Sequence, residues 1–109
     1  MESEKTAGTG DRQAQGAFRA LRAKVLARRG EFEDAKRMAR EAIQITKDAG
    51  ELDHDGDNWF DLGEVLRLAG HTEEAAEAVR TATGFWEQKG NVVLAARGRA
   101  VLAGLAAGS

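Results

Sequence analysis

Oxygen-bearing side chains recur within one short stretch of the sequence, DHDGDNWFDLGE, which covers residues 53–64. Carboxylates stand at its first, third, fifth, ninth and twelfth positions, which are Asp53, Asp55, Asp57, Asp61 and Glu64. Oxygens at this spacing can surround one hard cation such as calcium. A loop of this kind would make the chain a calcium-responsive binding module.

A helix is the competing interpretation of the same letters. In a helix, Trp59, Leu62 and Leu66 share one face, whereas a calcium loop of the EF-hand type needs residues 53–61 to stay non-helical. Asn58 stands where such a loop requires glycine for its sharp turn, and the chain has no second loop to pair with it. We therefore favour a helix that starts at Asp57 or Asn58, with its N-terminal acids stabilised by the helix dipole. Calcium binding by residues 53–64 remains the alternative.

Other residues that could do chemistry are scarce. The two histidines, His54 and His71, stand seventeen positions apart with no cysteine to complete a zinc site. The only serines are Ser3 and Ser109, both near the chain ends, and no Gly-x-x-x-x-Gly-Lys-Ser/Thr phosphate-binding loop is present. The sequence therefore predicts that the protein is not an enzyme and has no cofactor, and that calcium is the one metal with a candidate site.

Composition narrows the class of protein and its partners. The 109 residues carry sixteen basic and eighteen acidic side chains, and this balance argues against a nucleic-acid binder driven by bulk charge. No apolar run approaches the roughly 20 residues that a membrane span needs, so we predict no membrane partner. The absence of cysteine favours a cytoplasmic location.

Helix-forming residues and regularly placed glycines predict an all-α fold of about five helices. Residues 1–12 are polar and contain glycine, which predicts a disordered tail. The helical domain should cover residues 13–107, because apolar residues recur there at helical spacing and glycine breaks the pattern. We expect antiparallel hairpins at 13–50 and 57–90 and a capping helix at 91–106.

An internal repeat supports this arrangement. Two segments match at a shift of 40 residues, so that Gly30 pairs with Gly70, Ala35 with Ala75 and Ala42 with Ala82. Self-similarity of this kind indicates one helix hairpin that is used twice.

The second hairpin resembles a tetratricopeptide repeat. The resemblance rests on Trp59-x-x-Leu62-Gly63-x-x-Leu66, followed by Gly70, Ala75, Val79 and Ala82. Leu66 replaces the usual tyrosine, Val79 replaces phenylalanine, the closing proline is missing, and the spacing of 40 exceeds the usual repeat of about 34 residues. Residues 22–43, 61–82 and 89–103 also resemble the C-terminal helical tails of large bacterial regulatory proteins, in which a cyclase or transcription-regulator domain accompanies a P-loop ATPase.

The resemblance implies a non-enzymatic interaction or scaffold module of α-solenoid type, complete or cut from a longer regulatory protein. In this family the first helix of each hairpin lines the inner wall, where a protein or peptide partner binds. The corresponding residues here are Phe60, Asp61, Glu64, Arg67, Leu68, Leu21, Lys24 and Arg28. Leu21, Lys24 and Arg28 lie in hairpin one, and the acids lie in hairpin two. This wall can therefore hold a charged peptide or pair with itself.

The first helix predicts a second interaction surface. Phe18, Leu21 and Val25 share one of its faces, and a chain of two and a half repeats has no preceding repeat to cover them. Exposed apolar patches of this kind commonly mark an interface. We therefore expect this face to mediate self-association, as in a homodimer, or docking to another domain.

Overall fold

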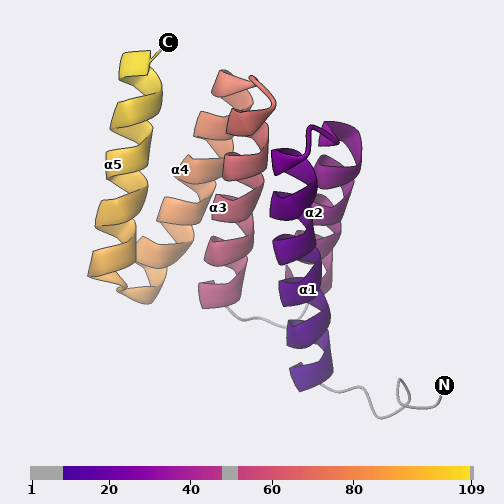
Figure 1. Ribbon diagram of the computed structural model, residues 1–109. Coiled ribbons are helices and arrows are strands. Elements are labelled where there is room, and N and C mark those ends of the chain that lie inside the picture. Colours follow the sequence, from indigo (N-terminus) through magenta and orange to yellow (C-terminus); the bar gives the residue numbers. More distant parts are fainter. Residues whose placement is uncertain (1–8, 48–51, 109) are drawn as a thin grey trace, which may run out of the picture.

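The molecule is a row of antiparallel helices with the two chain ends at opposite ends of the row (Figure 1). The computed structural model describes residues 9–47 and 52–108, and within them the chain forms helices and no strand. The helices are α1 (Thr9–Arg28), α2 (Phe32–Lys47), α3 (Leu52–Leu68), α4 (Thr72–Lys89) and α5 (Val92–Gly108). The predicted all-α fold of five helices in antiparallel hairpins is confirmed.

Two layers follow from the packing of these helices. Helix α1 packs against α2 and α3, and α4 packs against α3 and α5. One hollow is lined mainly by α1, α3 and α5, and a second by α2, α3 and α4. Since the Cα atoms span 49 × 34 × 16 Å, the domain is a thin slab with two broad faces.

Glycine ends three of the helices in the way that the sequence predicts. Gly30, Gly70 and Gly90 adopt φ angles of 83°, 87° and 85°, a left-handed conformation that L side chains rarely adopt. At each end the glycine N–H and the next N–H donate back to carbonyls of the last turn, as when Gly30 donates to Ala27 and Glu31 to Leu26. These pairs of bonds are Schellman caps, and they allow connections of only two or three residues between helices.

Helix α3 starts at Leu52, earlier than the Asp57 or Asn58 that the acidic composition suggested. The reason is that polar groups of this segment form hydrogen bonds to α2, which belongs to the other hairpin. The side-chain N–H of Asn58 donates to the hydroxyl of Thr46 at 2.8 Å and to the carbonyl of Ala42 at 3.3 Å, and the Thr46 hydroxyl lies 3.3 Å from the Asp55 carboxylate. Burial of these groups is therefore tolerated, and the helix extends through what looked like a linker.

The other predicted boundaries differ by a few residues. Helix α1 begins at Thr9, inside the stretch 1–12 that the sequence assigned to a tail, and residues 1–8 lie outside the described residues. The predicted end of hairpin one at Gly50 also lies outside them. Helix α5 runs to Gly108, and its N-terminus is capped by the Asn91 side chain, which accepts the N–H of Leu94 at 3.1 Å.

The core depends on small residues at the helix contacts. Alanines on the second helix of each hairpin are almost completely buried: Ala35, Ala39 and Ala42 on α2, and Ala75, Ala78 and Ala82 on α4. Leu62, Val65, Leu66 and Trp86 fill the space that remains. Such contacts let antiparallel helices approach closely, which the repeat at a shift of 40 residues predicted.

The structure extends this repeat to positions that the sequence comparison did not reveal. A methyl group added at Gly16 would meet the Cγ2 atom of Thr46 at 2.7 Å, and one added at Gly56 would meet Cδ1 of Trp86 at 2.8 Å. Both members of these pairs are related by the shift of 40 residues. Each hairpin thus packs a glycine of its first helix directly against a side chain of its second.

We predict opposite effects for two glycine-to-alanine substitutions. In Gly63→Ala the new methyl group would lie 2.7 Å from Cγ2 of Val79 and 3.3 Å from the carbonyl oxygen of Ala75, so unfolding free energy should fall by about 1–3 kcal/mol. In Gly84→Ala nothing lies within 4 Å, and the better helix propensity should raise unfolding free energy by about 0.5–1 kcal/mol. Urea denaturation followed by circular dichroism measures both. Equal shifts in the two variants would contradict the packing described for Gly63.

Candidate functional site

A groove of about 450 Å³ crosses the face formed by α1, α3 and α5. Helix α3 supplies its floor with Asp57, Phe60, Asp61 and Glu64, which lie three or four residues apart and so share one side of the helix. Helix α1 borders it with Lys24 and Arg28, α4 contributes Trp86, and α5 closes it with Leu94 and Arg97. The groove therefore draws on four of the five helices.

Ion pairs neutralise the middle of this groove. The Nζ atom of Lys24 lies 3.3 Å from the Asp61 carboxylate and joins α1 to α3. The Glu64 carboxylate accepts from Arg67 at 2.6 Å within α3. In contrast, Arg28 and Arg97 form no ion pair with any described residue. The predicted wall pairs with itself only in part, and it leaves one guanidinium group at either side.

Asp61 is a titratable group whose pKa the groove perturbs. Burial raises the pKa of its carboxyl above the ordinary value, the cation of Lys24 opposes this rise, and the nearby charges of Asp57 and Glu64 add to it. Because the pKa is higher in the folded chain than in the unfolded one, the ionised carboxylate costs stability at neutral pH. That cost disappears as the pH falls through the raised pKa.

Aromatic rings connect the groove to the core. The rings of Phe60 and Trp86 lie 5.4 Å apart at an angle of 44°, and the guanidinium of Arg97 stands 5.0 Å from the centre of the Phe60 ring. This cation–π contact fixes Arg97 over the groove floor. The buried Nε1 of Trp86 has no hydrogen-bond partner among the described residues, because Gly56 packs against this edge of the indole ring.

Five of the eight predicted wall residues line this groove: Lys24, Arg28, Phe60, Asp61 and Glu64. Leu21 lines a smaller hollow beside it, which shares Lys24, Asp57 and Asp61 with the groove. Arg67 and Leu68 do not line it, since Arg67 bonds to Glu64 and Leu68 packs half-buried against the core. That these residues bind a partner remains a prediction.

Leu94 and Arg97 are groove residues that the sequence analysis missed. Both lie on α5, which was expected only to cap the stack. No local pattern indicates their role. They enter the groove because α5 takes the place that the first helix of a third hairpin would occupy.

The apolar face of α1 is as uncovered as the sequence predicts. Phe18 and Leu21 are each 61% exposed and Val25 is 41% exposed, whereas Leu26 on the same helix is buried. Its role in self-association stays a prediction.

The calcium interpretation gains no support. Residues 53–64 are helical, Asp55 faces α2 whereas Asp57 and Asp61 face the groove, and Glu64 is paired with Arg67. Across the described side chains no three acidic or histidine groups are placed to hold a metal ion, and the Asp53 and His54 side chains lie outside them. No helix in residues 9–47 and 52–108 has the length and apolar character needed to cross a bilayer.

We predict that Lys24→Met raises the pKa of Asp61 further. The substitution keeps an apolar stem of similar length but removes the cation that opposes the effect of burial. Stability should therefore fall at neutral pH and recover in acid, where Asp61 is protonated in both proteins. NMR titration of the Asp61 side-chain carboxyl carbon measures the pKa, with Arg22→Met on the same helix as the control. An Asp61 pKa that is unchanged in Lys24→Met would contradict this electrostatic coupling.

Comparison with known proteins agrees with this architecture. The family model described as tetratricopeptide repeat matches residues 16–88, which span both hairpins. Neither the search of curated proteins nor that of solved structures found a match. The narrower resemblance to the tails of bacterial cyclase and ATPase-type regulators is not confirmed. Because the family model covers more than half of the chain, the protein belongs to the tetratricopeptide repeat family.

Proposed function

We propose that the domain is a non-enzymatic interaction module whose groove on α1, α3 and α5 receives an extended segment of a partner protein. The observation that carries this proposal is the pair of guanidinium groups, Arg28 and Arg97, which border the groove without a carboxylate partner among the described residues. Repeats of this family commonly serve protein–protein interaction, and the Phe60 ring beside Arg97 adds an apolar contact.

The order of charges across the groove favours a segment of mixed charge. Basic groups lie at the α1 and α5 sides, and carboxylates of Asp57, Asp61 and Glu64 lie on α3 between them. Carboxylates of the partner would therefore bind Arg28 and Arg97, while a polar or basic side chain would lie over α3. Arginine suits this role because its planar group can donate two parallel hydrogen bonds to one carboxylate.

Self-association is a second candidate function, and the exposure of Phe18 and Leu21 favours it. Both side chains protrude from the outer face of α1, which in a longer repeat array would receive another helix. A second copy of the chain can cover this face by pairing α1 with α1 about a twofold axis. The protein would then act as a scaffold that presents two grooves.

We predict that peptides selected from a random display library on the wild-type protein bind through the two arginines. The double variant Arg28→Glu/Arg97→Glu should weaken their binding at least about tenfold, because buried charge contacts to carboxylates are worth more than about 1.4 kcal/mol. Arg22→Glu/Arg80→Glu, with the same change of charge outside the groove, should stay within about twofold. Isothermal titration calorimetry measures the dissociation constants. Equal losses of affinity in both double variants would contradict the proposed site.

Light scattering across a concentration series tests self-association. The wild-type mass should rise from the 11.7 kDa of one chain towards a dimer, and Leu21→Glu should remain at the mass of one chain. Val93→Glu is the matched control, because Val93 is 78% exposed at the other end of the row on α5. Its dimer should persist if α1 pairs with α1, and its loss would indicate head-to-tail stacking of α1 on α5 instead. A wild-type chain that stays monomeric at all concentrations would refute self-association.

A further inference from the structure

A second groove, of about 360 Å³, lies between α2 and α4 and shares no lining residue with the first. Helix α3 separates the two grooves. Its residues Asp55 and Trp59 are four positions apart and face this second groove, whereas Asp57, Phe60 and Asp61 face the first. The two grooves therefore lie on different sides of the slab.

The floor of the α2–α4 groove is apolar. Ile43 of α2, Trp59 of α3 and Phe85 of α4 line it, and each of these side chains is only half-buried. Three large apolar side chains in contact with solvent leave surface that a ligand can cover, and burial of such area is favourable.

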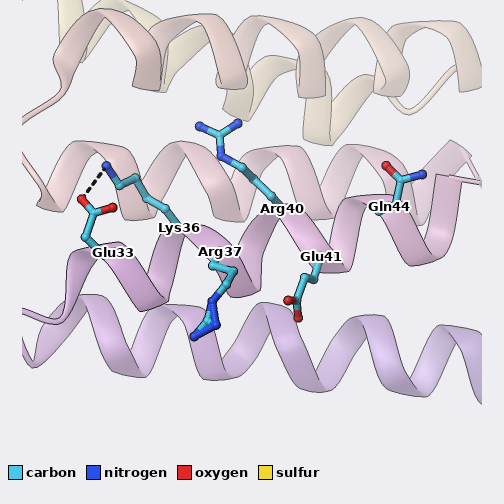
Figure 2. A pocket seen from close by; sticks show the side chains of 6 residues that line it. All are labelled: Glu33, Lys36, Arg37, Arg40, Glu41 and Gln44. Atoms are coloured by element: carbon cyan, nitrogen blue, oxygen red, sulfur yellow. Dashed lines mark ion pairs between the residues drawn. The ribbon is translucent and has the colours of Figure 1, made fainter.

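The rim of this groove is positively charged. Figure 2 shows Arg40 and Gln44 on one side of α2, and Arg37 and Glu41 on the opposite side. Glu41 binds Arg19 on α1, and Arg37 and Lys36 pair with acids of their own helix. Arg40 lines the α2–α4 groove together with Lys47, and neither forms an ion pair with a described residue.

The single acidic residue in the lining does not cancel these charges at the surface. Asp55 is 7% exposed, and its carboxylate accepts a hydrogen bond from the hydroxyl of Thr46 at 3.3 Å between α2 and α3. A ligand in the groove would therefore meet two cations at the rim and an apolar floor between α2 and α4.

We propose that the α2–α4 groove is a second docking site, whose occupant is an extended partner segment with apolar side chains between two carboxylates. Arg40 and Lys47 are seven residues apart on α2, which corresponds to about 10 Å along the helix. Three residues of a chain in the polyproline II form of extended backbone cover about 9 Å, and this form places side chains three positions apart on the same face. Carboxylates at the first and fourth positions of a segment can thus reach the two cations while the residues between them cover Trp59 and Phe85.

Two tryptophans report separately on the two grooves. Trp59 lines the α2–α4 groove and Trp86 lines the groove of α1, α3 and α5. In a ¹⁵N-labelled full chain, each indole N–H gives its own NMR signal. The probe is an acetylated and amidated octapeptide with leucine and phenylalanine between two aspartates, and a second octapeptide carries lysines in place of the aspartates.

The aspartate peptide should move the indole signal of Trp59 and the amide signals of Thr81 and Phe85, and leave Leu94 and Arg97 in place. Arg40→Glu/Lys47→Glu should weaken its affinity at least about tenfold, because two attractive contacts become repulsive. Arg37→Glu, on the opposite side of the same helix, should stay within about twofold. All three residues are exposed, so circular dichroism should show unchanged helix content.

The proposal would be overturned if the lysine peptide bound as tightly as the aspartate peptide, or if Arg40→Glu/Lys47→Glu lost no affinity. It would also be overturned if the NMR shifts were confined to Trp86, Leu94 and Arg97, or if no signal moved at millimolar peptide. Movement of the Trp59 signal with protein concentration alone would show that a second copy fills the groove, and would also overturn it. The Arg28→Glu/Arg97→Glu variant should bind the aspartate peptide as the wild type does. The two grooves are therefore tested independently, and failure of one proposal leaves the other standing.

Discussion

Close approach of antiparallel helices is the constraint on which this structure depends. Glycine and alanine occupy many of the positions where two helices touch, and at Gly16, Gly56 and Gly63 even one additional methyl group would collide with a neighbouring side chain. Because the helices lie so close, buried apolar area is spread over many small contacts rather than over a few large side chains. The result is a thin slab in which most helices keep one face in contact with solvent.

Polar groups inside such a slab must find partners within it. Thr46 on α2 and Asn58 on α3 are partners of this kind. Their hydrogen bonds join α2 to α3 and so connect the two hairpins. Leucine at either position would leave buried donors or acceptors unsatisfied, at a cost of about 1–3 kcal/mol for each group. Trp86 is the exception, because the contact of its ring with Gly56 leaves the buried indole N–H without an acceptor among the described residues.

The sequence alone was sufficient for the class of fold and for most helix ends. Glycines at 30, 70 and 90 predicted helix ends, and in the structure each forms a Schellman cap, because glycine adopts the required backbone angles without strain. The start of α3 was not predictable in this way. Its acids and glycine resemble a linker locally, and only bonds from Asn58 to Thr46 and Ala42, sixteen or fewer residues earlier in the chain, make this segment helical. Likewise, Arg97 enters the groove only because α5 stacks beside α3, which no local pattern reveals.

Several buried positions keep their residue type between the two hairpins, whereas positions that face the groove do not. At a shift of 40 residues, Leu26 corresponds to Leu66 and Ala35 to Ala75, and all four are buried. At the same shift, Lys24 corresponds to Glu64 and Leu21 to Asp61, so that charge or polarity changes at positions on the groove side. Packing at a helix contact restricts volume, whereas a side chain that faces solvent is restricted only by what it meets there. The hairpin can therefore be recognised from its buried residues, while the chemistry of the groove follows from where the stacked helices place their charges. Lys24 and Asp61 illustrate this, because they belong to different hairpins and yet form an ion pair, whereas Arg28 and Arg97 of the same groove form no ion pair with a described residue.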